Sequence, residues 1–267
     1  MGKEIAVIKK CLTDSGAILR KYFRKVDYKL KGRANLLTKA DLASQKAVLK
    51  TITSAFPDHD YLAEEDSRKL TGSRWLWIVD PLDGTTNYAH GYPASCISIG
   101  LVKDGKPFAG GVYDPFRDEL FLVQKGRGAT LNGKKISVSG TKKLSESLLY
   151  TGFGYDRAER AEFYCSFYID FIKICHDVRR SGSAALDMAW VACGRVDGMW
   201  EFKLNPWDVT AGLLLVSEAG GKVSDFSGKP WDDPLKFGFE TLAANGKIDR
   251  EMLRVIGKRV AAWKQAA

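Results

Sequence analysis

The sequence predicts an α+β fold in which layers of helices and sheets pack on one another. Near the N-terminus, apolar residues at three- and four-residue spacing predict a pair of amphipathic helices. Between residues 95 and 124, short apolar runs separated by turn residues predict an antiparallel sheet. After residue 148, strand-like and helix-like segments alternate. This order of elements predicts a layered architecture and is not that of a TIM barrel or a Rossmann domain.

The first two helices are predicted from hydrophobic periodicity. One is expected from about residue 3 to 25, with an apolar face formed by Ile5, Ile8, Leu12, Leu19 and Tyr22. The second follows Thr38 and ends before Pro57, with an apolar face formed by Leu42, Leu49, Ile52 and Phe56. Asp41 fits a capping box with Thr38, so a structural role is sufficient to explain this acid.

An acidic stretch follows the next predicted strand. Tyr61 to Ala63 is expected to be a short strand, and it leads directly into Glu64-Glu65-Asp66. Three adjacent carboxylates repel one another, which is costly unless a cation lies close by. The stretch therefore contains a candidate cation ligand.

The segment from Trp75 to Asn87 joins an apolar strand to a charged turn. Aromatic and β-branched residues favour a strand over 75–79, and Pro81, which has no N–H group, predicts that this strand ends at Asp80. Asp80 and Asp83 then share one tight turn, where two carboxylates need a cation or a proton between them. The small residues that follow offer backbone N–H groups to an anion. A metal ion beside a phosphate would satisfy both halves of this segment.

The middle of the chain is predicted to form an antiparallel meander. Strands are expected at 96–102, 108–113 and 119–123, separated by turns at Asp104-Gly105 and Asp114-Pro115. A strand at 148–151 and a helix near 159–175 follow.

Two later helix starts carry charged residues. The run from Arg179 to Leu186 opens a helix that ends by Gly194. Its paired arginines suit an anionic substrate, and the alternative is an ion pair between elements. Glu201 follows a strand expected at 196–200. Asn205-Pro206-Trp207-Asp208 has the cap, the first-turn proline and the acid of an ordinary helix start, so local chemistry alone makes Asp208 structural. A strand at 240–244 and an amphipathic helix complete the chain.

Two separate motifs resemble those of the inositol monophosphatase family of Mg²⁺-dependent, lithium-sensitive phosphatases, in its bacterial branch. Asp80-Pro-Leu-Asp83-Gly-Thr85-Thr86-Asn87 is similar to the first family signature, and Trp207-Asp208-Val-Thr-Ala211-Gly212 to the second. The resemblance covers residues 3–260. It implies the α-β-α-β-α sandwich shared with fructose-1,6-bisphosphatases. We expect a single phosphatase domain over 1–267, with an α+β half at about 1–150 and an α/β half at about 151–267.

The resemblance implies a site for two or three Mg²⁺ ions, at which Li⁺ inhibits. The implied metal ligands are Glu64, Asp80, the Leu82 carbonyl, Asp83 and Asp208. The implied catalytic residues are Asp41, Glu64 and Thr85, with Thr85, polarised by Asp41, positioning the attacking water. The implied substrate contacts are Asp83, Gly84, Thr85, Arg179, Ala184 and Glu201. The family motif at Glu64 is usually Gly-Glu-Glu, so the departure at Ala63 leaves a neighbouring acid as an alternative ligand.

The expected reaction is hydrolysis of myo-inositol monophosphate to inositol and phosphate. Fructose-1,6-bisphosphate, a 3',5'-bisphosphonucleotide and histidinol phosphate are the rival substrates. Thr86-Asn87 resembles the inositol branch more than the bisphosphonucleotide branch, which often has Lys-Glu there. The resemblance also implies a homodimer.

The charge distribution suggests a function of a different class. The net charge is +9, and residues 1–33 hold ten basic against three acidic side chains. A solvated helix face explains this excess, and a surface that binds RNA or RNA machinery is the alternative.

The five cysteines include no C-x-x-C pair, which disfavours a zinc site. No apolar run approaches the ~20 residues that span a bilayer, and the N-terminus has no signal-peptide core, so a cytoplasmic location is expected.

Overall fold

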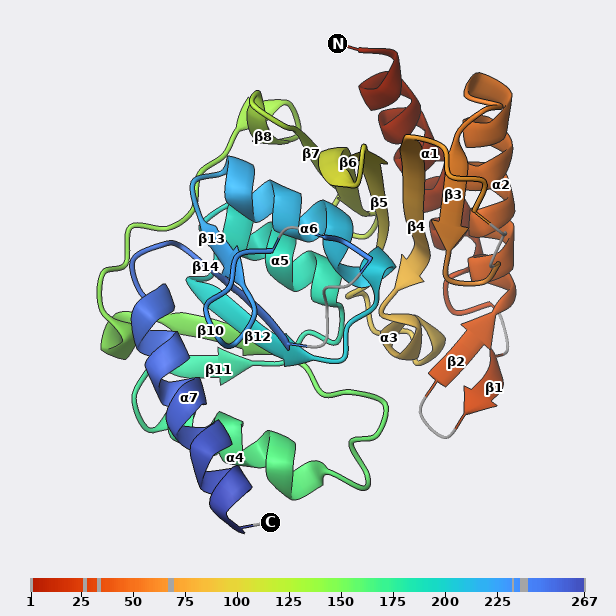
Figure 1. Cartoon of the computed structure of the whole chain (residues 1–267). Helices are drawn as coiled ribbons and strands as arrows, with labels where there is room; N and C mark the ends of the chain where they lie inside the picture. Colours follow the sequence, from red (N-terminus) through yellow and green to blue (C-terminus); the bar gives the residue numbers. More distant parts are fainter. Residues whose placement is uncertain are drawn as a thin grey trace.

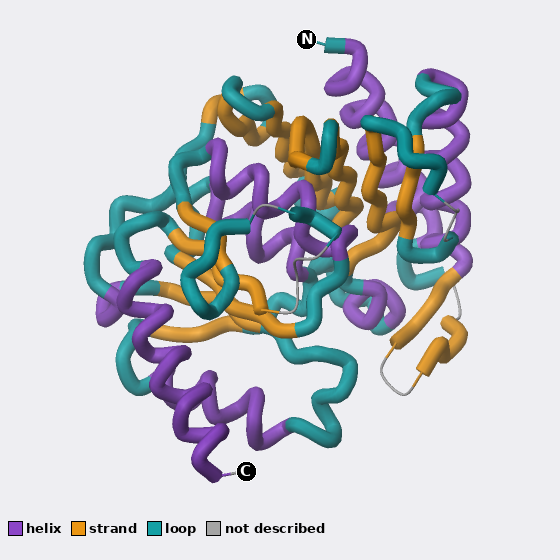
Figure 2. The backbone as a smooth tube through the Cα atoms, in the orientation of Figure 1, coloured by secondary structure: helices purple, strands orange, loops and turns teal. Residues whose placement is uncertain are grey.

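The computed structural model describes residues 2–25, 28–32, 35–66, 70–231, 233–235 and 240–266. These residues form the predicted α-β-α-β-α sandwich (Figure 1). One outer layer contains α1 (Lys3–Tyr22) and α2 (Lys39–Ala55), and the other contains α4 (Ala161–Ile172) and α7 (Asp249–Ala266). The middle layer contains α5 (Ala184–Ala192) and α6 (Pro206–Glu218). Figure 2 shows these two helices between the two groups of strands.

The larger sheet has seven strands among the described residues, in the order β3-β4-β5-β6-β7-β8-β9. Their bounds are β3 (Asp60–Ala63), β4 (Trp75–Asp83), β5 (Cys96–Lys103), β6 (Lys106–Asp114), β7 (Glu119–Gln124), β8 (Gly128–Leu131) and β9 (Lys134–Lys135). β3 is parallel to β4, and each later pair is antiparallel. The predicted meander is therefore confirmed.

The second sheet has the order β11-β10-β12-β14-β13 in the described part of the chain. Its strands are β10 (Leu148–Thr151), β11 (Asp177–Arg179), β12 (Gly198–Phe202), β13 (Lys222–Ser224) and β14 (Glu240–Ala244). A separate hairpin of β1 (Tyr28–Gly32) and β2 (Asn35–Thr38) precedes α2. The remaining short elements are α3 (Thr85–Ala89) and a 3₁₀ helix (Leu144–Glu146).

The hydrophobic pattern of each helix matches its layer. Every residue of α5 is buried, because this helix lies between two sheets. α1 is amphipathic and buries its apolar face against α2 and the larger sheet. It ends at Tyr22, earlier than predicted, since Arg24 has a left-handed φ of 59° that no helix continues through. α4 is also shorter than predicted at both ends.

β4 differs from the prediction in a way that matters for the site. The strand does not end at Asp80 but continues to Asp83. Asp80 pairs with Ser98 and Asp83 with Cys96, so Pro81 and Leu82 together lie opposite Ile97. This bulge accommodates a proline that cannot donate to the ladder. In a regular strand, residues three apart point to opposite faces, and the extra residue instead places Asp80 and Asp83 on the same face.

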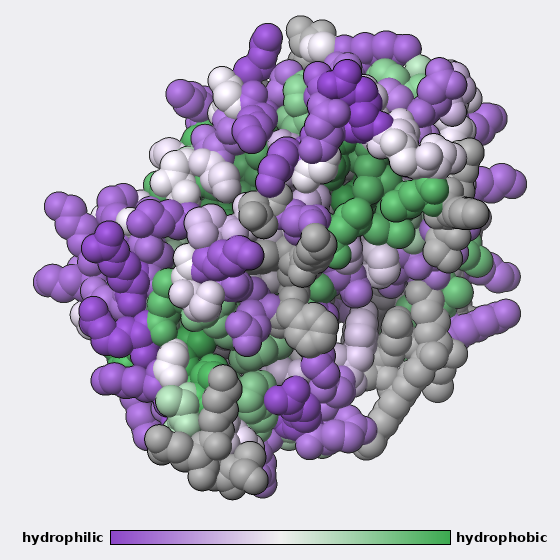
Figure 3. All heavy atoms as spheres, in the orientation of Figure 1, coloured by the Kyte–Doolittle hydropathy of each residue, from purple (hydrophilic) through white to green (hydrophobic). Residues whose placement is uncertain are grey.

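No helix in the described ranges is long and apolar enough to cross a membrane. Figure 3 shows hydrophilic side chains over much of one face of the molecule, with hydrophobic side chains gathered in smaller patches between them.

Two glycines of the larger sheet allow α6 to approach it closely. A Cβ atom at Gly100 would lie 2.4 Å from Thr210 Cγ2, and one at Gly110 would lie 3.2 Å from the Ala211 Cα. Both α6 residues follow Asp208 closely in the sequence. The sheet surface at these glycines therefore helps to set the position of Asp208.

We expect Gly100→Ala to lower the free energy of unfolding by about 1–3 kcal/mol, because the added methyl group overpacks the contact with α6. Urea denaturation measures this change. Gly257→Ala in α7 is the control, since no atom lies within 4 Å of its added Cβ. The control should be neutral or stabilising by up to about 1 kcal/mol. Equal destabilisation by both substitutions would contradict the packing argument.

Candidate active site

A polar cavity of about 310 Å³ contains nearly all of the predicted site residues. Its walls come from the end of β4, the start of α3, the loop after β10, and the first residues of α5 and α6. The predicted residues that line it are Glu64, Asp80, Leu82, Asp83, Gly84, Thr85, Ala184, Glu201 and Asp208. Asp41 and Arg179 are not among its lining residues.

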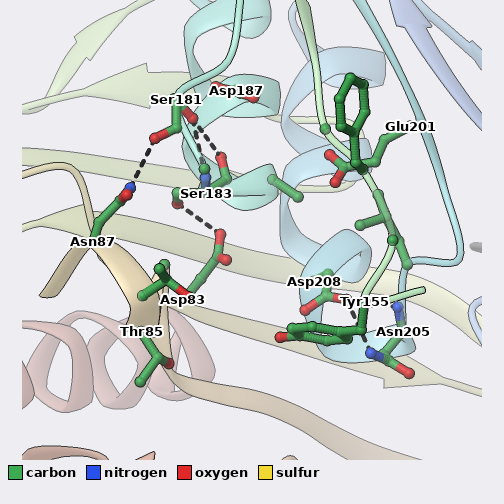
Figure 4. A pocket seen from close by; sticks show the side chains of 18 of the residues that line it. Asp83, Thr85, Asn87, Tyr155, Ser181, Ser183, Asp187, Glu201, Asn205 and Asp208 are labelled. Carbon is green, nitrogen blue, oxygen red and sulfur yellow. Dashed lines mark hydrogen bonds between the residues drawn. The ribbon is translucent and has the colours of Figure 1, made fainter. Parts of the chain in front are cut away.

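Three carboxylates converge on one wall of this cavity. Asp80, Asp83 and Asp208 each offer an oxygen, and these oxygens all lie within 4.8 Å of one another. Figure 4 shows Asp83 at the end of β4 and Asp208 at the start of α6. Asp80 and Asp83 face the same way because of the bulge in β4, and Asp208 is brought in from the second sequence motif by α6. The arrangement is a candidate divalent-cation site.

Hydrogen bonds hold one oxygen of each of these acids. The Leu82 N–H donates to Asp80 Oδ1 at 2.9 Å. Asp83 Oδ2 accepts from the Ser183 hydroxyl and the Ala185 N–H, each at 2.7 Å. Asp208 Oδ2 accepts from the Asn205 N–H at 2.6 Å, which completes the capping box of α6. Asp208 therefore caps α6, as its neighbours in the sequence predict, and it also contributes an oxygen to the candidate cation site.

Burial shifts these acids toward their neutral forms, and repulsion from neighbouring acids adds to the shift for Asp80 and Asp208. Burial raises the pKa of Asp80 well above its usual value, and Glu64, Asp83 and Asp208 raise it further. Burial raises the pKa of Asp208 to about 8, with Asp83 as the next cause. Because a cation would favour the charged forms of all these acids, the donor set fits a metal ion.

Asp41 acts on the cavity through Thr85. The Thr38 N–H and hydroxyl both donate to Asp41 Oδ2, at 2.8 and 2.5 Å, which confirms the predicted capping box. The other oxygen of Asp41 lies 3.2 Å from Thr85 Oγ1, whose second neighbour is the Leu82 carbonyl at 2.9 Å. One carboxylate thus both caps α2 and contacts a cavity residue.

Two further predicted positions, Gly84 and Glu64, also line the cavity. Gly84 has a φ of 85°, and a Cβ atom there would lie 2.9 Å from the Ala94 carbonyl oxygen, so this turn requires glycine. Of the acids after β3, Glu64 is the one that lines the cavity. Its neighbour Glu65 donates its backbone N–H to Gln45 Oε1 at 3.0 Å.

Glu201 lies within β12 rather than after it, opposite Thr241 in the sheet. Gly152 leaves the space for its carboxyl group, which a Cβ atom there would overlap. Burial raises the pKa of Glu201 to about 8, and the charges of Asp83 and Asp208 contribute. Glu201 therefore faces the acids of the candidate metal site across the cavity (Figure 4).

Arg179 does not reach the cavity. It is exposed at the end of β11 and forms an ion pair with Asp177. Arg180 lines the cavity instead, with its guanidinium carbon 4.3 Å from the centre of the Phe153 ring. Adjacent residues at a strand end point in opposite directions, so the sequence alone could not decide which of the two arginines faces inward.

A sequence model of the inositol monophosphatase family matches residues 3–260. The chain belongs to this family. An inositol-1-monophosphatase from Synechocystis is 48% identical over 85% of this chain and 78% of its own length. A protein named Nus factor SuhB from Xylella fastidiosa is 38% identical over 94% of both chains. The solved structure of an inositol monophosphatase from Anabaena has a TM-score of 0.85 and 44% identity, covering 97% of this chain and 98% of its own. The chain is a phosphatase of this family, with the family's fold.

The phosphatase cavity also contains residues that the sequence analysis did not select. They include Tyr155, Arg157, Asp187 and Lys203. Burial raises the pKa of Asp187 well above its usual value. The sequence did contain a signal for Asp187, since it is the single acid in the apolar run from Ala184 to Val191. Acidic side chains are seldom fully buried unless they are paired with another group. The loop after β10 carried no comparable signal.

We expect the metal-free phosphatase to lose thermal stability as the pH rises. Asp208 and Glu201 have a pKa of about 8 in the folded chain, against about 4 for an unfolded carboxyl group. Because the folded chain binds these protons more tightly, their contribution to stability is complete below about pH 4 and is lost as the pH rises through about 8. In EDTA, the Tm should fall between about pH 5 and about pH 8.5.

Asp208→Asn provides the comparison, because its amide is neutral throughout this range. Its Tm should fall less than that of the unaltered chain over the same interval. Identical falls in both proteins would show that Asp208 does not titrate as its surroundings indicate.

Proposed function

We propose that this phosphatase hydrolyses myo-inositol monophosphate in a Mg²⁺-dependent reaction. The observation that carries the proposal is the convergence of Asp80, Asp83 and Asp208 within 4.8 Å in the wall of a polar cavity. These ligands are hard oxygen donors and include no His or Cys, which suits Mg²⁺ better than zinc. The hypothesis assigns Glu64, Asp80 and the Leu82 carbonyl to one ion, and Asp80, Asp83 and Asp208 to another.

Bound Mg²⁺ would supply positive charge that lowers the pKa of water and offsets the charge developing on the leaving oxygen. The protein residues orient the reactants. Asp41 can accept a hydrogen bond from the Thr85 hydroxyl, which leaves the Thr85 oxygen free to accept a hydrogen bond from the attacking water. The N–H groups of Gly84 and Thr85 are the proposed donors to the phosphate oxygens.

The leaving alcohol is assigned to the opposite side of the cavity, at Ala184 and Glu201. A buried Glu201 with a pKa of about 8 can hydrogen-bond to a hydroxyl group in either protonation state. This favours a polyol as the leaving group. Fructose-1,6-bisphosphate, a 3',5'-bisphosphonucleotide and histidinol phosphate remain the alternative substrates.

A panel of these four compounds with Mg²⁺, followed by release of phosphate, tests the substrate. myo-Inositol monophosphate should have the highest kcat/KM. A rival with a value at least ~10-fold higher would replace it, because that ratio is about 1.4 kcal/mol of transition-state discrimination.

Asp80→Asn should lower kcat by about 1,000-fold or more, a loss of about 4 kcal/mol in transition-state stabilisation, while the circular dichroism spectrum stays the same. The matched control is Asp104→Asn, an exposed acid at the β5–β6 turn that is ion-paired with Arg74 outside the cavity. Asparagine also tolerates the left-handed backbone at that position. Near-normal activity in Asp80→Asn would refute the proposed metal site.

Lithium inhibition tests the second ion. Li⁺ replacing Mg²⁺ at Asp80, Asp83 and Asp208 would retain phosphate after hydrolysis, so inhibition should be uncompetitive toward the substrate. Activity should rise and then fall with Mg²⁺ concentration, and Asp208→Asn should reduce both activity and lithium sensitivity. Competitive inhibition, or unchanged sensitivity in an active Asp208→Asn enzyme, would place the ion elsewhere.

Binding to RNA or RNA machinery is the second candidate function, and the name of the Xylella relative favours it. Several basic side chains near the N-terminus have partners within the chain. Lys3 donates to the Ala55 carbonyl, Lys10 pairs with Asp14, and Arg24 donates to the Gly91 carbonyl. These contacts support the reading of a solvated helix face. Tight, salt-sensitive RNA binding in a filter assay, without phosphatase activity, would reverse the ranking.

The homodimer and the cytoplasmic location stay predictions.

A further inference from the structure

We propose that Ser44 and Gln45 of α2 are positioning residues for the metal ligands, Ser44 through the bulge of β4 and Gln45 through the backbone beside Glu64. This inference rests on the proposed Mg²⁺ site and names residues that keep its ligands in place. Neither residue lines the cavity, so each acts through a hydrogen bond to a segment that does.

One face of α2 is buried against the larger sheet. The buried residues of the helix recur at three- and four-residue spacing and include Asp41, Ser44, Gln45, Val48 and Ile52. Val48 and Ile52 belong to the same buried hydrophobic cluster as residues of β4. Apolar packing therefore fixes α2 on the sheet, and the polar residues at the start of the same face contact the segments that form the site.

The bulge in β4 requires hydrogen-bond partners from outside its own strand pair. An extra residue in one strand interrupts the ladder, and a buried carbonyl group without a partner is costly. The hydroxyl of Ser44, which is fully buried, donates to the Pro81 carbonyl at 2.8 Å. The next carbonyl group, that of Leu82, accepts from the Thr85 hydroxyl at 2.9 Å. Ser44 therefore holds the irregular turn itself, one peptide unit away from the carbonyl assigned to Mg²⁺.

Gln45 holds the backbone that follows β3. Its side-chain Oε1 accepts the backbone N–H of Glu65 at 3.0 Å, and Gln45 is buried. The backbone N–H of Glu64 donates to the Val79 carbonyl of β4 at 3.2 Å. The peptide units on both sides of the Glu64 Cα are thus bound, one to α2 and the other to β4. This fixes the direction in which the Glu64 side chain leaves the backbone, toward the cavity that it lines.

The two contacts act on different ligands of the proposed ions. Loss of a hydrogen bond that supports a metal ligand typically weakens metal affinity about 10- to 100-fold. Ser44 supports the turn that joins Asp80 and Asp83, and Asp80 is assigned to both ions. Gln45 supports Glu64, which is assigned to one ion. The two residues should therefore differ in which ion they affect.

Ser44→Ala should weaken Mg²⁺ binding to the substrate-free chain about 10-fold, measured by calorimetry with Mg²⁺ alone. It should raise the lithium concentration for half-inhibition by a similar factor. Ser147→Ala is the matched control, because Ser147 is also fully buried and its hydroxyl also donates to a backbone carbonyl, that of Leu144, outside the cavity lining. The control should lose stability without a change in Mg²⁺ affinity.

Gln45→Met removes the acceptor oxygen at nearly the same side-chain length. It should weaken the binding of one Mg²⁺ ion about 10-fold and leave half-inhibition by lithium unchanged, because the ion that Li⁺ replaces is not assigned to Glu64. Gln45→Glu keeps an acceptor oxygen and should not weaken Mg²⁺ binding. If Ser44→Ala does not fold, Ser44→Cys takes its place, because a thiol donates only weakly.

Equal Mg²⁺ affinities in the Ser44 variant and Ser147→Ala would show that Ser44 only stabilises the fold, and equal affinities in Gln45→Met and Gln45→Glu would show the same for Gln45. Either result would overturn the positioning role of that residue while leaving the proposed phosphatase intact. Failure of the proposed function is distinguishable, because the unaltered chain itself would then bind no Mg²⁺, and this inference would fall with it.

Discussion

The candidate metal site depends on a mismatch of one residue between two neighbouring strands. Pro81 and Leu82 lie opposite the single residue Ile97, and this extra residue turns Asp83 to the same face as Asp80. Without it, the alternation of a regular strand would send the two acids to opposite sides of the sheet. Deletion of Pro81 or Leu82 would therefore separate the acids even if the sheet formed. The proline stabilises the irregular geometry, because it has no N–H group to leave unpaired.

The overall architecture was predictable because its signals are strong and local. Periodicity located the amphipathic α1 and α2, and turn residues separated the strands of the meander. The motif residues were identified through resemblance, since Asp208 looks like an ordinary helix-cap acid from its neighbours alone. The position of a side chain within a cavity was harder to predict, and Arg179 shows why. Two adjacent arginines give the same sequence signal, while the strand end turns only Arg180 inward.

The cavity residues in the loop after β10 could not be predicted from the sequence, for a different reason. Its cavity residues Tyr155 and Arg157 have no characteristic spacing, and they line the same cavity as the acids of β4 although the two segments are far apart in the sequence. Such contacts depend on the packing of distant segments. The β4 bulge was missed because the rule that proline ends a strand has an exception at bulges.

The two oxygens of each site carboxylate have different roles, and this difference has an evolutionary consequence. In Asp83 and Asp208, one oxygen accepts hydrogen bonds from the scaffold, and the other remains available to a ligand. An asparagine keeps one acceptor oxygen for the scaffold but loses the negative charge. A single substitution of this kind can therefore separate chemistry from architecture, and a descendant of this chain could stop turning over substrate while keeping its shape and its surfaces. Within such a lineage, the presence of the fold is weak evidence for the reaction, and the identity of these two residues is the better guide.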